Sequence, residues 1–408
     1  SASRIVVNET DIPDEGDFEA TYAYTPADNA GRWAKFSQGV GYANGDEACI
    51  WDGEQMRCAA FFSITAAPSG LTLTNPIDYT VAVNNSLTDG NNPTVSKFLI
   101  GSTRPLQGFY ITIATANETT STLAVQEFTA AGWANVTTLV DGTAAGGITM
   151  AQSGAVSFAS TVTTSKQALI EETRLYYYYV ALSAGSAGIN QVTVNAPFQE
   201  MVDIWDGVYR DCIHAQATRS SSHENWTQEV NTESSAEYPI AAKFGGLTSS
   251  DSIELCCQER ACAARLAFIA GKVNATAATV TVKYWNGAAY ASVGTVYDGT
   301  AVSGATFAQT GIVSWVTPSE ATERQRARYG VSGYWYEFTF SATLTDGSSH
   351  DGTSVDTITF IPAEKSVFPF AFPFEFQGRA MLCDFSAGQE GNRRSEEHTS
   401  ELQSPNTN

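Results

Sequence analysis

The sequence predicts an all-β chain that contains two tandem jelly-roll-like β-sandwich modules. Residues 125–158 return 157 positions later as residues 282–315, and 16 of the 34 aligned positions are identical. Apolar residues alternate with polar ones throughout, and Gly, Asn and Ser interrupt the alternation, which is typical of strands joined by turns. A period this long indicates that a whole domain is duplicated, because solenoid repeats are much shorter.

The two modules are expected at residues 94–200 and 250–370. Each has an apolar strand before the repeated segment and an aromatic strand after it. These flanking strands are KFLIGS at 97–102, YYYY at 176–179, IELCCQ at 253–258 and YWYEF at 334–338. Together with the repeated segment they supply roughly eight strands in about 100 residues, the size of a sandwich domain.

A shorter repeat lies outside the modules. It reads IWDGEQMRC at 50–58, IWDGVYRDC at 204–212 and, less closely, EFQGRAMLC at 375–383. Its glycine is expected to turn a β-hairpin, so hairpin segments, with propeller-like strands as an alternative, join the sandwiches. The expected remaining parts are an N-terminal β segment with a truncated start at 1–93, a linking hairpin segment at 201–249 and the start of a truncated further β domain at 371–393.

The C-terminal end is set apart from the fold. Residues 394–404, RSEEHTSELQS, resemble the conceptual translation of a sequencing adapter, so residues 394–408 are expected to be a disordered artefact. The tail points to a metagenomic shotgun assembly as the source. With the start at Ser1 in place of a methionine, it predicts that the chain is a fragment of a longer protein.

The charge and hydropathy of the chain limit its partners. The net charge is −21, and an acidic surface of this size repels nucleic acid phosphates and anionic membranes. No stretch approaches 18 uninterrupted apolar residues. We therefore expect neither a nucleic acid nor a membrane as partner, and 43% apolar residues are enough to build a core in each module.

The repeated segment contains an Asp-Gly-Thr sequence in both copies, starting at Asp141 and Asp298. Asp-Gly pairs commonly supply the positive φ of a tight turn, and turn chemistry is the favoured interpretation. A calcium ion bound by these carboxylates stays an open alternative, since loop carboxylates suit hard cations.

Three aromatic pairs exchange only among aromatic residues between the copies. The pairs are Phe128 with Trp285, Trp133 with Tyr290, and Phe158 with Trp315. Retained bulk predicts packing between the two sheets. Trp133 and Tyr290 are also candidates for stacking on a sugar ring, with core packing as the favoured alternative.

The cysteines are interpreted as buried apolar residues. Cys256, Cys257 and Cys262 form a C-C-x4-C pattern that, with Cys212, His214 or His223, would be an unusual zinc site. At the 157-residue offset Cys256 and Cys257 fall on Leu99 and Ile100, which predicts that they lie in a strand core. No metal and no cofactor are therefore expected.

Catalytic motifs are not found in the sequence, which has no nucleophile elbow, phosphate-binding glycine loop or metalloprotease helix. The carboxylate pairs Glu171–Glu172 and Asp203–Asp206 are interpreted as surface acids. The prediction is that the chain is not an enzyme.

Several strings resemble a module of phage tail, neck and other virion structural proteins. In the first copy these are FLIGSTRPLQGFYITI, LAVQEFTAAGWANV, AQSGAVSF and YYYYVAL, and in the second VKYWNGAAYASV, GIVSWVTP and YWYEFTF. The first copy departs from this pattern, with Phe128 in place of the more common Trp. The segment FPFEFQGRAMLCDFSAGQEGN is similar to the opening strands of propeller-like virion domains. The resemblance implies a structural virion component and supplies no catalytic residues.

Two hypotheses about function follow. In the first, the chain is a non-enzymatic virion component, assembled in the host cytoplasm and extracellular after release, whose partners are other virion proteins, copies of itself or a host-surface glycan. In the second, it is a secreted or cell-surface carbohydrate-binding adhesin array. A third hypothesis, a polysaccharide-degrading tail enzyme, would place the active site outside this chain.

Overall fold

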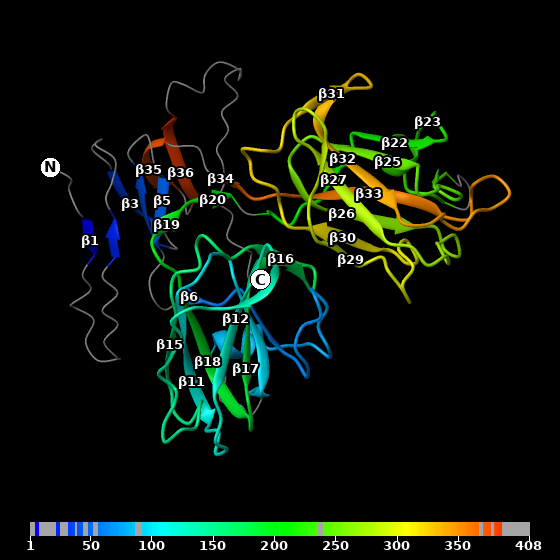
Figure 1. Cartoon of the computed structure of the whole chain (residues 1–408). Coiled ribbons are helices and arrows are strands. Elements are labelled where there is room, and N and C mark those ends of the chain that lie inside the picture. The colour runs from blue at the N-terminus through cyan, green and yellow to red at the C-terminus, as the bar shows by residue number, and fades with distance from the viewer. Residues whose placement is uncertain are drawn as a thin grey trace. The chain divides into compact units, whose positions relative to one another are not determined.

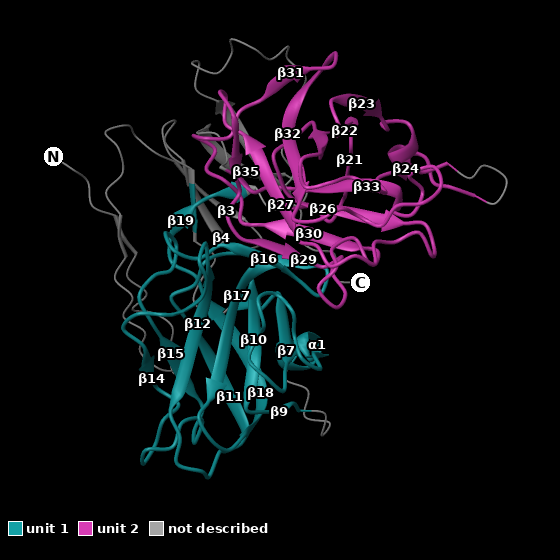
Figure 2. Cartoon of the chain, turned by 45° about the vertical axis from the view of Figure 1, so that its right-hand side comes forward, with its two compact units in different colours: residues 1–203, 366–408 teal, residues 204–365 magenta. Residues whose placement is uncertain are grey.

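The chain forms two compact units, residues 1–203 with 366–408, and residues 204–365 (Figure 2). A computed structural model describes residues 5–7, 22–24, 32–36, 39–43, 48–51, 56–85, 92–203, 205–235, 240–366, 370–376 and 379–385. Each unit contains one sandwich of two antiparallel sheets. The predicted all-β architecture with sandwich-like sheets is confirmed.

The first sandwich is built from strands between β6 and β18, labelled in Figure 1, and these strands belong to the first unit. In spatial order its first sheet contains β13 (Gly132–Asn135), β12 (Leu123–Thr129), β17 (Thr173–Leu182), β10 (Lys97–Ser102), β7 (Ala60–Ser63) and β8 (Ile77–Asp78), with β16 (Gln167–Ile170) beside β17. Its second sheet contains β14 (Val140–Asp141), β15 (Gly154–Ser157), β11 (Gly108–Thr115), β18 (Ala187–Asn195) and β6 (Met56–Arg57), with β9 (Thr94–Val95) beside β18. The short helix α1 (Thr80–Asn84) follows β8.

The second sandwich repeats this topology. Its first sheet contains β23 (Ser222–Asn225), β22 (His214–Arg219), β25 (Ser252–Cys257), β32 (Val331–Phe340), β27 (Val280–Trp285) and β28 (Tyr290–Ser292), with β31 (Arg326–Arg328) beside β32. Its second sheet contains β21 (Arg210–Asp211), β33 (Ser354–Pro362), β26 (Ala261–Phe268), β30 (Gly311–Trp315) and β29 (Val296–Asp298), with β24 (Ala242–Lys243) beside β33. A 3₁₀ turn, η1 (Glu229–Asn231), follows β23.

The remaining strands form small sheets outside the two sandwiches. The first unit also has a two-stranded sheet of β1 (Ile5–Val7) and β2 (Tyr22–Tyr24), and a four-stranded sheet of β19 (Gln199–Glu200), β5 (Ala48–Trp51), β4 (Gly39–Ala43) and β3 (Arg32–Phe36). Strands β20 (Val202–Asp203) and β34 (Lys365–Ser366) lie where the chain passes between the units. The hairpin of β35 (Phe370–Phe376) and β36 (Arg379–Phe385) falls in the segment expected at 371–393, whereas residues 386–393 and the adapter-like tail lie outside the described residues.

Strand register shows which positions of the two sandwiches correspond. Ile100 pairs with Tyr178, and Leu255 pairs with Tyr336. On the other side of the same central strands, Glu127 pairs with Tyr178 and Tyr284 pairs with Tyr336. Tyr178 and Tyr336 are therefore equivalent, and so are Ile100 and Leu255.

This register corrects the alignment of the cysteines. Cys256 corresponds to Gly101 and Cys257 to Ser102, so the constant 157-residue offset is wrong by two residues in β25. The cause is a longer connection in the second copy. Leu266 precedes Asn274 by eight residues, whereas the equivalent Ile111 precedes Asn117 by six.

Both sandwiches begin earlier in the chain than expected. Arg57 pairs with Thr193 in the first sandwich, and Arg210 pairs with Phe360 in the second. The short repeat thus supplies an edge strand to each sandwich, which starts near residues 56 and 210 instead of 94 and 250. Its third copy does form the predicted hairpin, with Phe376 opposite Arg379. The physical reason is that Cys58 and Cys212, both buried, join the apolar cores.

The inward-facing tyrosine of each central strand, β17 or β32, forms a hydrogen bond with the backbone of the other sheet, just before β11 or at the start of β26. The Tyr178 hydroxyl accepts a hydrogen bond from the Leu106 N–H at 2.7 Å and lies 2.6 Å from the hydroxyl of Thr161. The Tyr336 hydroxyl accepts from the Ala261 N–H at 2.6 Å and donates to the Glu323 carboxylate at 2.5 Å. Burial raises the pKa of Tyr178 to about 12, and burial and then Glu323 raise that of Tyr336.

The aromatic pairs divide between two places. Phe158 and Trp315 lie in the cores between the sheets, as predicted. The other two pairs lie on the outer face of the first sheet of each sandwich, where Phe128 is opposite Trp133 and Trp285 is opposite Tyr290. The prediction of packing between sheets is wrong for these two, because their strands present them to the face away from the core.

We expect Tyr336→Phe to lower the free energy of unfolding of the second unit by about 2–3 kcal/mol, because one oxygen of the buried Glu323 carboxylate loses its donor and the Ala261 N–H loses its acceptor, while Arg260 still pairs with the other oxygen. Tyr178→Phe loses only neutral hydrogen bonds and should cost the first unit about 1–2 kcal/mol. Urea unfolding of the full chain, followed by tryptophan fluorescence, measures both. Tyr110→Phe, at a half-buried position of β11, is the control; equal losses from all three variants would contradict the assigned role.

Candidate functional site

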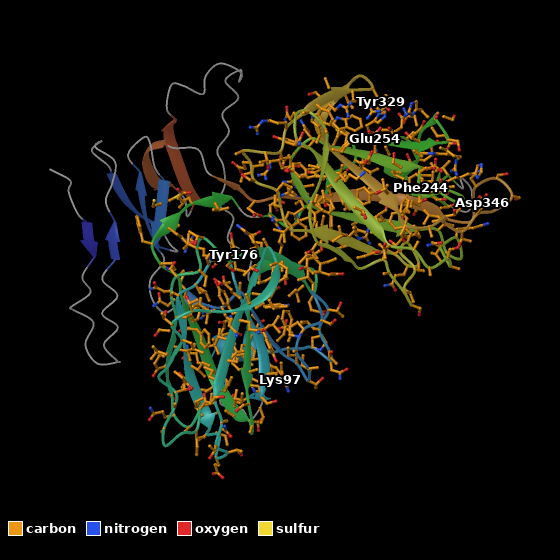
Figure 3. The ribbon with its side chains drawn as sticks, in the orientation of Figure 1. Lys97, Tyr176, Phe244, Glu254, Tyr329 and Asp346 are labelled. Atoms are coloured by element: carbon orange, nitrogen blue, oxygen red, sulfur yellow. The ribbon has the colours of Figure 1, made fainter. Side chains whose placement is uncertain are left out.

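The outer face of the first sheet in the second sandwich gathers charged and aromatic side chains. Strand alternation explains why. Ile253 and Leu255 of β25 enter the core, so Glu254 between them faces outward. Glu254 and Tyr329 lie together on this face (Figure 3), where the Tyr329 hydroxyl donates to the carboxylate at 3.3 Å.

Glu254 is buried although it faces away from the core. Its side chain is 4% exposed, and a charged group so covered requires several donors to offset its lost hydration. The Tyr290 hydroxyl donates to it at 2.8 Å, and the Arg328 guanidinium pairs with the same carboxylate oxygen. Burial raises the pKa of Tyr290, and the charge of Glu254 raises it further, so the phenol stays protonated as a donor at neutral pH.

Aromatic rings surround this carboxylate. The His214 ring stacks on the Tyr329 ring with centroids 5.2 Å apart and 15° between the planes, and its centroid is 5.4 Å from that of Trp335. The Trp335 indole N–H donates to the carbonyl of Arg326 at 2.8 Å. These contacts fasten the hairpin of β31 and β32 against the sheet.

Arg326 is held by aromatic rings instead of by a carboxylate. Its guanidinium carbon lies 4.0 Å from the centroid of the Trp285 ring and 5.7 Å from that of Tyr290. No carboxylate among the described residues pairs with it. The N–H donors of a stacked guanidinium remain available for a planar oxygen pair such as a carboxylate.

The first sandwich has an apolar layer at the corresponding positions. The register places Ala60, Phe62, Leu99, Ala168, Ile170 and Tyr177 where the second sandwich has His214, Gln216, Glu254, Arg326, Arg328 and Trp335. All six residues of the first set are buried. One scaffold therefore carries an apolar layer in one copy and a charged aromatic face in the other.

The sequence analysis missed Glu254, Arg326 and Arg328. The constant offset of 157 placed Glu254 on Lys97 and hid the contrast with Leu99. Aligning the copies through Tyr178 and Tyr336, with a gap of two residues before Asn274, would have found it.

The structure places the two predicted sugar-stacking residues at equivalent positions. Trp133 and Tyr290 are both half-buried, and each meets an aromatic neighbour edge-on, with Phe128 at 5.5 Å and Trp285 at 5.6 Å between centroids. The Trp133 indole N–H donates to the Gly70 carbonyl at 2.7 Å, as Tyr290 donates to Glu254. Both polar atoms are thus used within the chain, and sugar stacking stays a prediction.

The Asp-Gly-Thr carboxylates serve local hydrogen bonds. In both copies the aspartate accepts from the N–H of the following threonine at 2.9 Å and from its hydroxyl at 2.5 Å. No group of three or more metal-ligating side chains occurs in the described part of the chain. These contacts support the turn interpretation of Asp141 and Asp298.

The glycines of these turns have a different role from the predicted one. Gly142 and Gly299 do not have positive φ, so that prediction is wrong. A Cβ on Gly142 would lie 2.5 Å from the Ala155 carbonyl oxygen, and one on Gly299 would lie 2.7 Å from that of Ile312. Glycine is needed because the two backbones approach closely.

The described cysteines are buried, as predicted. Burial raises the pKa values of Cys58, Cys212 and Cys257 to about 12. Thiols of this kind are unreactive at neutral pH. Cys383 lies in a strand whose side chains are outside the described set.

Comparisons with known proteins identify no family. No family model matches the chain, and no curated protein matches it. A solved structure described as the structure of allantoicase is similar over 68% of this chain and 80% of its own, with 9% sequence identity and a TM-score of 0.19. At this TM-score the similarity identifies neither a fold nor an activity. Among the described residues, no helix has the length and apolar character to cross a bilayer.

Two single substitutions, Leu99→Glu and Glu254→Leu, test whether the outer layer is apolar in the first sandwich and polar in the second. We expect Leu99→Glu to lower the free energy of unfolding of the first unit by about 4 kcal/mol or more, because the buried charge meets an apolar layer. Glu254→Leu should cost the second unit about 2 kcal/mol, since Arg328 is 26% exposed and can be hydrated. Urea denaturation of the full chain measures both, and a milder effect of Leu99→Glu than of Glu254→Leu would refute the contrast.

Proposed function

We propose that this chain is a non-enzymatic structural component of a phage virion, in a tail, neck or baseplate, that acts through its repeated β modules in assembly or host attachment. The observation that carries the proposal is the divergence of one face on a duplicated scaffold. Residues that hold each sandwich together are retained, whereas those on the outer face of the first sheet differ in charge and polarity.

The retained residues are internal. Besides Tyr178 and Tyr336, they include the buried Asn117 and Asn274, whose side-chain carbonyls each accept from the N–H two residues later, at 3.1 and 3.0 Å. The retained Asp-Gly-Thr turns lie in the same sheet of each sandwich. Function is carried by sites on a fold and not by the fold itself, so a duplication that keeps the frame and changes one face lets each module contact a different neighbour.

Support for the virion setting comes from the sequence motifs. The strings FLIGSTRPLQGFYITI and VKYWNGAAYASV, which resemble modules of virion proteins, form β10 and β11 and the β27–β28 hairpin. These strands belong to the frame of each sandwich. The acidic charge of the chain is compatible with a particle protein that does not contact the packaged nucleic acid.

A carbohydrate-binding adhesin array, secreted or on a cell surface, is the second candidate. The observation that favours it is the pair Trp133 and Tyr290, half-buried aromatic residues at equivalent positions on an outer face. Against it, Arg326 lies over the neighbouring Trp285 ring in the second sandwich, and Phe128 replaces that tryptophan in the first.

Mass spectrometry of fractions from the source material tests the proposal. The tryptic peptide at residues 273–283 should be enriched in nuclease-treated, density-purified virus particles, together with capsid peptides. Recovery of this peptide from cell envelopes or secreted soluble protein, and not from particles, would favour the adhesin. Light scattering of the purified full chain gives an independent check, since assembly predicts species larger than the 43.6 kDa monomer.

A further inference from the structure

The hairpin of β31 and β32 is a basic segment in an acidic chain. Residues 324–333, called here the basic hairpin, contain Arg324, Arg326 and Arg328, and the net charge of the chain is −21. Arg328 is neutralised by Glu254, and an Arg324 N–H group donates to the carbonyls of Glu320 and Glu323. Arg324 and Arg326 therefore carry charge that no carboxylate of the described residues balances.

Arg326 is positioned before any partner arrives. Stacking on Trp285 at 4.0 Å restricts its guanidinium, and the Trp335 indole N–H fixes its backbone carbonyl. A restricted guanidinium loses less conformational freedom when it pairs, and its fork of N–H donors matches a carboxylate.

The corresponding hairpin of the first sandwich has an acidic turn, and its single basic residue, Arg174, is buried. Residues 167–176, called here the acidic hairpin, turn through Glu171 and Glu172 between the paired residues Ile170 and Thr173. Both glutamates are exposed, and neither forms an ion pair with a described residue. In the basic hairpin, Tyr329 and Gly330 occupy the same turn between Arg328 and Val331.

The backbone of the acidic turn disfavours these glutamates. Glu171 and Glu172 have φ of 47° and 62°, the left-handed conformation of a two-residue hairpin turn, for which Asn-Gly is preferred. Residues kept at a conformational cost are a recognised sign of a role outside folding. Two adjacent charges at the tip of a strained turn present carboxylates outward from the sheet.

We propose that the basic hairpin of one copy docks on the acidic hairpin of another copy, through Arg326 and Arg324 on one side and Glu171 and Glu172 on the other. This inference rests on the proposed function in assembly. Because the two hairpins belong to different modules, the contact is head-to-tail and would propagate into a ring or a filament. Charge complementarity selects a second copy as the partner, since every copy carries both hairpins.

The small free energy of exposed ion pairs limits how strongly the two hairpins can bind each other. An exposed ion pair contributes little by itself, so the hairpins set orientation and encounter rate, and repetition along an assembly supplies the strength. Salt screens such pairs, with a Debye length of about 10 Å at 0.1 M ionic strength. Self-association should therefore weaken as salt increases.

Reciprocal charge exchange on the full chain tests the docking. Sedimentation velocity at low salt should show self-association of the unmodified chain, weakened about tenfold or more by Arg326→Glu and equally by Glu171→Lys with Glu172→Lys. A mixture of the two variants should regain association, because each then meets an opposite charge on its neighbour. Arg265→Glu is the matched control, since Arg265 also lies over an aromatic ring, Tyr209 at 5.9 Å, on the second sheet. Far-UV circular dichroism checks that each variant is folded.

The outcomes separate the two proposals. Assembly that persists unchanged in both charge variants overturns the hairpin contact and leaves the virion role standing. A chain that stays monomeric at every salt concentration overturns both. If the variants instead lose only retention on an acidic polysaccharide column and keep their assembly, the basic hairpin binds a ligand and the proposed contact is wrong. Should Arg326→Glu fail to fold, Arg326→Gln with the same glutamate variants repeats the test with one charge removed.

Discussion

The two-residue period of the central strands β17 and β32 is the constraint on which both sandwiches depend. Tyr178 and Tyr336 face inward and satisfy the backbone at the start of the neighbouring sheet. Their neighbours Tyr177 and Trp335 must then face outward. The same alternation that closes each core therefore decides which side chains form the outer layer of the sheet.

The side chains of the outer layer are stabilised in two different ways, by apolar burial in the first sandwich and by hydrogen bonds and an ion pair in the second. In the first sandwich the layer is apolar and contains no buried charge, so burial of side chains such as Leu99 stabilises it, and the Tyr177 hydroxyl donates to the carbonyl of Ile170 at 3.2 Å. In the second, the buried carboxylate of Glu254 loses hydration, and hydrogen bonds from Tyr290 and Tyr329 with the Arg328 ion pair offset that loss. The second solution stabilises less for each group buried, but it leaves Arg326 placed on an aromatic ring with unused donors. A polar outer layer is thus better suited to contact with other molecules than to stability.

Much of the fold could be predicted from local pattern. The repeat located equivalent strands, and the apolar character of KFLIGS and IELCCQ identified β10 and β25. Predictions from local pattern failed where a contact between residues distant in sequence determines the role of a residue. The glycines of the Asp-Gly-Thr turns are required by the close approach of the backbone at Ala155 and Ile312, not by their own φ. Strands of the short repeat join the second sheet of each sandwich, where Arg57 pairs with Thr193 and Arg210 pairs with Phe360, and each partner lies more than a hundred residues later in the chain.

The sequence by itself determined that the chain is β, that a domain is duplicated, and that the cysteines from Cys49 to Cys262 are buried, because these follow from composition, period and hydropathy. Only the tertiary structure decided which residues of the two copies correspond to each other. A connection longer by two residues shifts β25 against the constant offset, and a shift of this kind changes which residues correspond without changing which face they occupy. Only strand pairing could therefore set Glu254 against Leu99 and Arg326 against Ala168, and only side-chain packing could place Arg326 over Trp285.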